Sequence, residues 1–402
     1  CDGGGGGSGP ILNSTFVTLG TPIHTSVATA DIDGDRLLDV VSVSNTLDPE
    51  TEQANVISQL IGGPGEFAPR VEFLIGDQSS RRTFYVVVAD LNLNGRPDIV
   101  FSHTGAVGSG SPGNKLSVML QDPTSAGQYF LPVSYDVGNL PRGIAVGDID
   151  LDGLPDLVTA TGDGLYLLRQ DGGALGRFLP AIQLSTQPTL AVAIGDVDND
   201  GLLDLAFDDN QAVQLLLNDP VNIGGFLTGS TLSVGGSPSD LALADLDDDG
   251  RLDIVVSNFE SSAAADRGSF SVLLQDPIID AQFLPFIEYV TDQALHVNSK
   301  AVADLNGDLL PDIVGAVDSL ENSNDKVVVL LQTLTGQGVF DAPVGYGFVS
   351  SDDPFQAVVG NLGPDTLPDI VVANALSGVY VLYQDPAEAG AFDPGIKIGE
   401  PL

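Results

Sequence analysis

Short apolar segments alternate with acidic turns along the chain. One unit of this pattern consists of apolar segments at 143–148, 156–160, 164–171 and 178–185, with an acidic loop at 148–156. The apolar segments are rich in Val, Ile, Leu and aromatic residues and are bounded by Gly, Pro, Asn and Asp, which is typical of strands joined by tight turns. No segment shows the sustained 3.6-residue period of an amphipathic helix. The pattern therefore predicts an all-β chain with four strands in each unit.

The acidic loop recurs seven times. Loops one to seven begin at residues 31, 90, 148, 196, 245, 304 and 361, at intervals of 48 to 59 residues. Such a period is typical of repeat architectures, and four antiparallel strands per period match a β-propeller blade. We therefore predict a seven-bladed β-propeller with four antiparallel strands per blade. Segments that resemble outer strands precede the first loop (13–20) and follow the last (393–400), so we expect one of them to close the ring.

Loops one to six present oxygen-bearing side chains at positions 1, 3, 5 and 9 of nine residues, and loop seven presents them at positions 1, 5 and 9. Calcium takes six to eight oxygen ligands, and a backbone carbonyl at position 7 would add one more. An EF-hand differs because helices flank it and Glu stands at position 12, whereas here a strand follows position 9. Magnesium fits less well, because it keeps several waters in a tight octahedron. The spacing predicts up to seven structural Ca²⁺ ions, in loops between the first and second strands.

The predicted metal ligands are Asp31, Asp33, Asp35 and Asp39; Asp90, Asn92, Asn94 and Asp98; Asp148, Asp150, Asp152 and Asp156; Asp196, Asp198, Asp200 and Asp204; Asp245, Asp247, Asp249 and Asp253; Asp304, Asn306, Asp308 and Asp312; and Asn361, Asp365 and Asp369. Position 6 is Gly in loops two to five, where it allows a sharp turn. Loops one, six and seven have Arg36, Leu309 and Thr366 there, with Gly34 and Gly307 two residues earlier in the first two of these. Loop seven also has Gly363 at position 3, which predicts a weak or empty site.

The stretch GQYFLPVSYDVGNLPRGIAVGDIDLDGLPDLVTA, residues 127–160, resembles the bacterial FG-GAP or VCBS-type repeat, whose relatives include the integrin α-subunit propeller. The resemblance implies a calcium-binding propeller. We expect the ions to be structural, because a catalytic metal keeps an open coordination position beside an acid or base, whereas here one loop recurs around the ring.

The first residues, CDGGGGGSG, resemble the start of mature bacterial lipoproteins. The resemblance implies a lipid on Cys1, a tether over residues 1–12 and a propeller over 13–402. It also implies a place at the bacterial cell envelope, anchored by lipid at the outer membrane or cell surface, with the periplasmic side left open. No apolar run approaches the roughly 18 residues of a membrane-spanning helix. Cys1 is the only cysteine, so no disulfide can form within the chain.

The chain is strongly acidic, with 55 Asp and Glu against 14 Lys and Arg and a formal charge of −41. Such a charge repels nucleic acid and anionic membrane surfaces. Several scarce basic residues map to the face opposite the acidic loops, where the loops between second and third strands vary in length, as binding surfaces often do. The predicted partner patch consists of Arg81, Arg82, Arg142, Lys300, His24, His103 and His296.

Three function classes remain open. A non-catalytic binding or scaffolding lipoprotein, with a protein partner or as an accessory subunit of an envelope assembly, fits a rigid propeller without a catalytic constellation. A glycan-binding propeller is the alternative, although the absence of Trp removes the best stacking surface for a sugar. A polysaccharide lyase or hydrolase is the third, but calcium loops account for the prominent acidic residues. We predict that the protein is not an enzyme.

Overall fold

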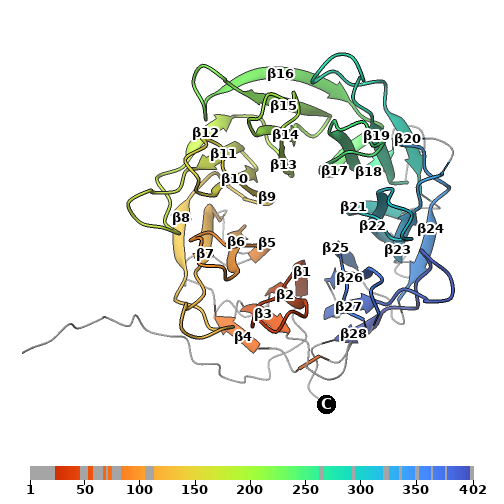
Figure 1. Ribbon diagram of the computed structural model, residues 1–402, viewed down its shortest axis with the longest axis horizontal. Helices are drawn as coiled ribbons and strands as arrows, with labels where there is room; N and C mark the ends of the chain where they lie inside the picture. The colour runs from red at the N-terminus through yellow and green to blue at the C-terminus, as the bar shows by residue number, and fades with distance from the viewer. Residues whose placement is uncertain are drawn as a thin grey trace, which may run out of the picture.

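The computed structural model describes residues 23–45, 53–57, 67–68, 71–74, 83–104, 113–261, 267–291, 295–319, 326–334, 337–348, 353–363, 365–375 and 378–398. The strands of these residues form seven four-stranded antiparallel sheets, each built from four strands consecutive in sequence. The sheets stand around a central axis like the blades of a propeller (Figure 1). The predicted all-β propeller with four antiparallel strands per blade is confirmed.

Blades one to seven begin with β1, β5, β9, β13, β17, β21 and β25, which face the axis (Figure 1). These innermost strands are β1 (Ile23–Ala30), β5 (Thr83–Ala89), β9 (Ile144–Gly147), β13 (Val192–Gly195), β17 (Gly236–Ala244), β21 (Leu295–Ala303) and β25 (Pro354–Gly360). The second strands are β2 (Asp39–Asn45), β6 (Asp98–His103), β10 (Asp156–Thr161), β14 (Asp204–Asp208), β18 (Asp253–Ser261), β22 (Asp312–Ser319) and β26 (Asp369–Asn374).

The two outer layers complete the blades. The third strands are β3 (Gln53–Ile57), β7 (Lys115–Met119), β11 (Gly164–Leu168), β15 (Ala212–Asn218), β19 (Ser269–Leu273), β23 (Lys326–Leu330) and β27 (Gly378–Leu382). The outer strands are β4 (Val71–Leu74), β8 (Val133–Asp136), β12 (Ile182–Ser185), β16 (Phe226–Ser233), β20 (Ile287–Val290), β24 (Val344–Gly347) and β28 (Ile396–Ile398). Within blade three, β12 begins later than the apolar segment that predicts it, because Phe178 makes only an isolated bridge with Gln170.

The hydrophobic core lies between the blades. Seven clusters of buried residues each combine side chains from two neighbouring blades, including one that joins blades seven and one. Second strands such as β10 are buried along their whole length, because a neighbouring blade covers each face of the sheet. This explains why they read as continuous apolar runs rather than as alternating ones. The burial of apolar surface between blades is the main stabilising contribution to the ring.

The C-terminal segment, one of the two expected to close the ring, belongs to blade seven. Residues 393–400 contribute β28 to blade seven, and β28 pairs with β27, its predecessor in sequence. Residues 13–20 lie outside the described residues. In the part of the chain that the structure describes, blades seven and one are joined by side-chain packing and hydrogen bonds rather than by a shared strand.

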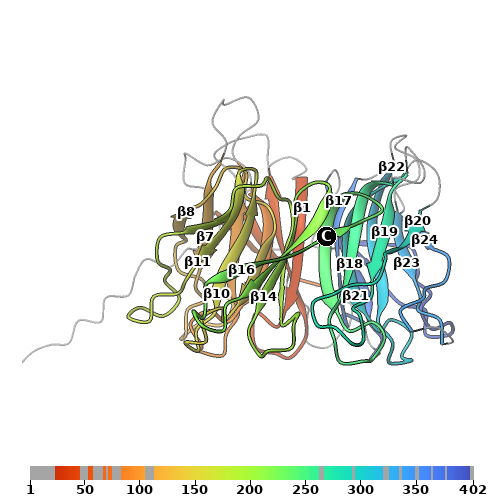
Figure 2. The same cartoon turned by 90° about the horizontal axis from the view of Figure 1, so that it is seen from above.

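All seven acidic loops connect a first strand to a second strand, so they lie on one face of the ring. The second strands therefore end on the opposite face of the ring, which Figure 2 shows edge-on. Among the described residues there is no helix long and apolar enough to cross a bilayer.

Candidate functional site

The acidic loops share one local structure, which loop three illustrates. Asp148 Oδ1 accepts the Asp152 N–H at 3.1 Å, and Asp148 Oδ2 accepts the Gly153 N–H at 2.9 Å. Asp152 Oδ1 in turn accepts the Leu154 N–H at 2.9 Å. The carboxylates at positions 1 and 5 therefore hold the backbone of the turn, as Asp side chains do in turns generally.

The loop needs two residues with left-handed backbone, at positions 4 and 6. In loop three these are Leu151 (φ 57°) and Gly153 (φ 87°). In loop one Gly34 takes position 4 (φ 84°) and Arg36 position 6 (φ 74°), and Gly307 and Leu309 do the same in loop six. The expectation that the earlier glycine eases the turn is thus confirmed for these loops. A left-handed Leu or Arg is strained, so loops one, three and six each carry one Gly and one strained residue.

The Asp at position 9 connects three parts of its blade. Asp156 Oδ2 accepts the Ile149 N–H at 3.2 Å within the loop, and Asp156 Oδ1 accepts the Gln170 N–H at 2.8 Å, just beyond β11. The same pair of bonds recurs in loops two, four, five, six and seven. Burial raises the pKa of Asp156 to about 6 and that of Asp253 to about 7, against the opposing effect of these hydrogen bonds. The Asp at position 9 therefore stabilises the blade through these hydrogen bonds, with or without a bound cation.

Four loops bring three carboxylates together. In loops one, three, four and five, oxygen atoms from positions 1, 3 and 9 all lie within 4.8 Å of one another. Three buried oxygens in these loops, Asp35 Oδ2, Asp150 Oδ1 and Asp247 Oδ1, have no hydrogen-bond partner among the described residues. A buried carboxylate oxygen without a donor is costly unless a cation binds it. The all-oxygen donor set fits a hard divalent cation such as Ca²⁺, but it does not by itself distinguish calcium from other hard cations.

The loops with Asn are arranged differently. Asn92 Nδ2 lies 3.2 Å from Asp98 Oδ2, Asn306 Nδ2 lies 3.1 Å from Asp308 Oδ2, and Asn361 Nδ2 donates to the Asp365 carbonyl at 2.9 Å. In loops two, six and seven, an amide N–H therefore binds a loop oxygen. The amide of Asn92 or Asn306 would have to rotate to offer its oxygen to an ion. Thr366 in loop seven does not have a left-handed φ, so this loop also departs from the common turn.

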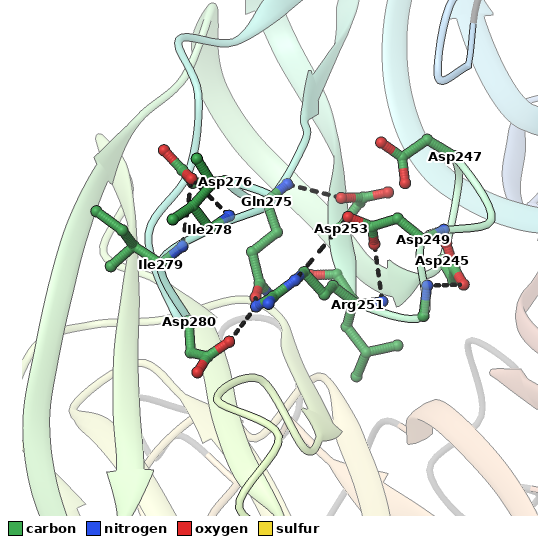
Figure 3. A network of polar contacts seen from close by, with 12 residues as sticks. Asp245, Asp247, Asp249, Arg251, Asp253, Gln275, Asp276, Ile278, Ile279 and Asp280 are labelled. Carbon is green, nitrogen blue, oxygen red and sulfur yellow. Dashed lines mark hydrogen bonds and ion pairs between the residues drawn. The ribbon is translucent and has the colours of Figure 1, made fainter.

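Loop five shows how a loop joins its surroundings (Figure 3). Asp245 holds the turn through the Asp249 and Gly250 N–H groups, and Asp253 accepts the Gln275 N–H at 2.7 Å. Arg251 pairs with Asp280, in the connection between the third and outer strands of the same blade. Burial raises the pKa of Asp247, and the nearby carboxylates of Asp249 and Asp245 raise it further. In the absence of a cation, these carboxylates repel one another.

A repeated amide that the sequence analysis missed connects loops one, three, four and six to the next blade. Gln275 Nε2 donates to the Val197 carbonyl of blade four at 3.0 Å and to the Leu252 carbonyl of its own blade at 2.9 Å. Equivalent bonds between blades come from Gln121, Asn218 and Gln384. The carbonyl that accepts belongs to position 2 of the preceding loop, where residues such as Ile149 and Val197 are fully buried. The signal in the sequence is the recurring Gln-Asp or Asn-Asp pair after the third strand.

A cavity of about 440 Å³ lies near the axis, on the side where the innermost strands begin. All seven blades contribute residues in or directly before their innermost strands. One representative from each blade is Thr25, Tyr85, Arg142, Ala191, Asp240, Lys300 and Gln356. Its position places it on the side of the ring opposite the acidic loops. We call it the central cavity.

Cations and aromatic rings meet in the central cavity. The Arg142 guanidinium lies over the Phe84 ring, with its Cζ 4.8 Å from the ring centre, and Phe84 contacts Phe355 edge to face at 5.1 Å. Burial lowers the pKa of Arg142, partly offset by the charge of Asp208, but an arginine remains protonated in proteins. Lys300 Nζ lies 2.9 Å from Asp240 Oδ1, and both side chains are nearly buried. This ion pair links β21 of blade six to β17 of blade five.

The structure brings part of the predicted partner patch together. Arg142 and Lys300 line the central cavity, and the ring of His296 stacks on Phe259, another lining residue, with centroids 3.9 Å apart. His103, by contrast, is buried inside blade two, where its Nε2 lies 2.8 Å from Ser117 Oγ. It packs within a sheet, so the sequence expectation of a surface position is wrong for this residue.

Some predicted residues fall outside what the structure describes. Arg81, Arg82 and Cys1 lie outside the described residues, and of His24 only the backbone, in β1, is described. The predicted lipid site and the remaining part of the patch therefore stay predictions.

Comparison with known proteins supports the repeat assignment. A family model described as an FG-GAP-like repeat matches residues 31–101, 148–207 and 196–256. No curated protein matches the sequence. The fold is similar to a solved structure from Agrocybe aegerita, described as the structural basis of a lectin's specific recognition of non-reducing terminal N-acetylglucosamine. The TM-score is 0.51 and the identity 19%, over 89% of this chain and 87% of that one. At this identity the likeness concerns the fold alone. The chain therefore contains FG-GAP-like repeats within a ring of four-stranded blades.

Proposed function

We propose that this chain is a non-catalytic binding propeller, stabilised by calcium in its acidic loops, that recognises a protein partner on the opposite side. The observation that carries the proposal is a separation of roles across the ring. The loop carboxylates hold turns and connect strands, whereas Arg142, Lys300 and aromatic side chains gather at the central cavity. A rigid ring with chemically distinct groups on one side suits recognition.

The proposed calcium ions have a structural role. Positions 1, 3 and 9 of loops one, three, four and five would hold them. Bound calcium supplies positive charge that offsets the repulsion among these carboxylates. The Asp at position 9 accepts a hydrogen bond from a backbone N–H just beyond the third strand. An ordered loop therefore also stabilises the position of the third strand in the blade. Loops two, six and seven, with their Asn ligands, are the weaker sites.

The binding role can be tested by chemical cross-linking in extracts of the source cell, with the full-length protein as bait and calcium present. We expect a protein cross-linked in fixed ratio, through residues on the side of the central cavity. The Arg142→Ser variant should reduce this cross-link, whereas Arg177→Ser, an exposed arginine in the connection between β11 and β12, should not. Cross-links confined to the acidic-loop side, or unchanged by Arg142→Ser, would contradict the proposal.

Glycan binding is the second candidate, and the fold similarity to the N-acetylglucosamine-binding lectin favours it. Aromatic side chains provide stacking surfaces for sugars, although this chain has only Tyr and Phe for that purpose. A glycan array probed in calcium and again in EGTA tests this candidate. Calcium-dependent binding of a defined terminal sugar, competed by the free sugar, would support glycan recognition over a protein partner.

The place of the protein at a bacterial cell envelope is a separate proposal. It depends on a lipid at Cys1, which lies outside the described residues. Mass spectrometry of the N-terminal peptide from the native source tests it directly. An unmodified Cys1 would remove the reason for placing the protein there.

A further inference from the structure

One arginine in the central cavity has no carboxylate partner in the part of the chain that the structure describes. Among the described residues, no Asp or Glu lies within ion-pair distance of the Arg142 guanidinium, and no hydrogen bond uses its side-chain N–H groups. The negative charge that acts on Arg142 is that of Asp208, which raises the arginine pKa against the effect of burial. Asp208 Oδ1 already accepts hydrogen bonds from the Leu190 and Ala191 N–H groups and from Thr189 Oγ1. In a chain with 55 acidic and 14 basic residues, the described part thus leaves one partly buried arginine without an ion pair.

The other cation of the cavity is compensated. Lys300 is paired with Asp240 at 2.9 Å, so these two groups together add no net charge. Arg142 therefore gives the lining an excess of one positive charge. A positive site in a partly desolvated cavity attracts an anion more strongly than the same charge in water would. The planar guanidinium, with five N–H donors, favours a carboxylate, which can accept two parallel hydrogen bonds.

The walls beside Arg142 are aromatic. Phe84 lies under the guanidinium, Phe355 meets Phe84 edge to face, and Phe259 lines the same cavity. The stacking of Arg142 on Phe84 restricts the guanidinium before any ligand arrives, which lowers the entropy cost of binding. The cavity volume of about 440 Å³ falls within the range of small-molecule sites, roughly 300 to 1,000 Å³. The combination fits a ligand with one charged end and one apolar end.

We propose that the central cavity binds a small organic acid, with its carboxylate on Arg142 and its apolar or aromatic body against Phe84, Phe355 and Phe259. This goes beyond the proposed function, because it concerns a small molecule inside the ring rather than a protein on its surface. The two proposals can fail separately. Binding of the small acid is measured with purified protein and a defined acid, whereas binding of a protein partner is measured by cross-linking in extracts. A polar sugar acid offers the same carboxylate without the apolar body, so it serves as a comparison ligand.

The test is isothermal titration calorimetry of the full chain in calcium with 3-phenylpropanoate, its neutral analogue 3-phenylpropanamide, and glucuronate. A charge-assisted pair with arginine predicts that the acid binds at least about ten-fold more tightly than the amide. The aromatic walls predict that 3-phenylpropanoate also binds more tightly than glucuronate. No saturable binding of 3-phenylpropanoate at millimolar concentration, or equal affinity for acid and amide, would overturn the proposal.

Variants locate the site. Arg142→Gln should remove the preference for the acid over the amide, and Arg142→Lys should retain part of it, because lysine keeps the charge but loses the planar fork. The matched control is Arg177→Gln, which removes the same charge from an exposed position on the other side of the ring. If Arg142→Gln does not fold, the Arg142→Lys protein and the acid-to-amide ratio of the wild type still decide the matter. A folded Arg142→Gln protein that keeps the full preference would place the ligand elsewhere and refute the inference.

Discussion

Ser26, in the innermost strand of blade one, donates a hydrogen bond to the side-chain oxygen of Gln356, in the innermost strand of blade seven, 330 residues away in sequence. The same Gln356 oxygen accepts the Val27 N–H at 3.0 Å, and Ser26 Oγ accepts the Val86 N–H of blade two at 2.9 Å. Both side chains are nearly or fully buried. One serine therefore ties three blades together where the two ends of the ring meet.

Removing the Ser26 hydroxyl should lower the free energy of unfolding, although the change is only one oxygen atom. Ser26→Ala leaves the Val86 N–H without its partner, and we expect a loss of about 1–3 kcal/mol in the free energy of unfolding. In a double-mutant cycle with Gln356→Leu, we expect a coupling energy of about 0.5–3 kcal/mol, measured by chemical denaturation. Strictly additive effects would mean that the bond between blades one and seven contributes nothing of its own.

The amides that link neighbouring blades lead to a second prediction. Gln275→Leu preserves the shape of the side chain but leaves the Val197 and Leu252 carbonyls without this donor in a buried region. We expect a loss of about 1–3 kcal/mol. Gln187→Leu, at an exposed position, is the control and should change stability by less than about 0.5 kcal/mol. Similar melting temperatures for the two variants would show that the amide link is unimportant.

The sequence predicts the four-stranded blade because several independent features of the pattern agree. The loop spacing, the apolar second strands and the recurring turns all describe one local unit, so four strands per blade follow from a single repeat. How the ring closes does not follow, because Ser26 and Gln356 become neighbours only when seven blades are in place. The sequence also contains an outer-strand pattern at each end, and pattern alone cannot decide which end pairs.

The same distinction applies to the sites. Three of the four predicted carboxylates of loop three, Asp148, Asp150 and Asp156, are close in sequence and come together in the structure. Residues from all seven blades line the central cavity, so no single sequence motif predicts it. The sequence predicts His103 in the partner patch at the surface, yet it is buried beside Ser117 and Phe101. A histidine with a hydroxyl partner is tolerated inside a blade, and composition does not show that partner.

Calcium should raise the melting temperature, and EGTA should lower it. A site filled at about 100 times its dissociation constant adds about 2.7 kcal/mol to the free energy of unfolding, so even two filled sites give a shift that differential scanning calorimetry resolves easily. Magnesium at the same concentration should give a smaller shift, because these open all-oxygen loops suit calcium better. An unchanged melting temperature in EGTA would contradict calcium binding.

Two variants in loop five separate ion binding from loop structure. Asp247 Oδ1 has no hydrogen-bond partner among the residues that the structure describes, so Asp247→Asn should weaken the response to calcium without lowering the stability measured in EGTA. Asp253→Asn disturbs the bonds to the Leu246 and Gln275 N–H groups and should lower stability in both conditions. Because Asn offers one oxygen where Asp offers two, we expect a loss of about 1–3 kcal/mol for the latter. A loss of stability in EGTA for Asp247→Asn would assign this carboxylate to loop structure instead.

The calcium-free protein should be less stable near neutral pH than in mild acid. Burial raises the pKa of Asp98, Asp156, Asp204 and Asp312 to about 6 and that of Asp253 to about 7, from 3.8 in an unperturbed chain. Between about pH 4 and pH 7 the folded state therefore binds more protons than the unfolded state, so the free energy of unfolding falls as pH rises through this interval.

Thermal melts in EGTA from about pH 5 to about pH 7.5 measure this effect, and the melting temperature should fall across the series. Calcium should reduce or reverse the slope, because it binds the ionised carboxylates. The high net charge also favours unfolding at higher pH, so the control is a charge-matched pair: Asp312→Asn should flatten the slope in EGTA, whereas Asp341→Asn, at an exposed position, should leave it almost unchanged. Equal slopes for the two variants would trace the pH dependence to overall charge rather than to the buried loop carboxylates.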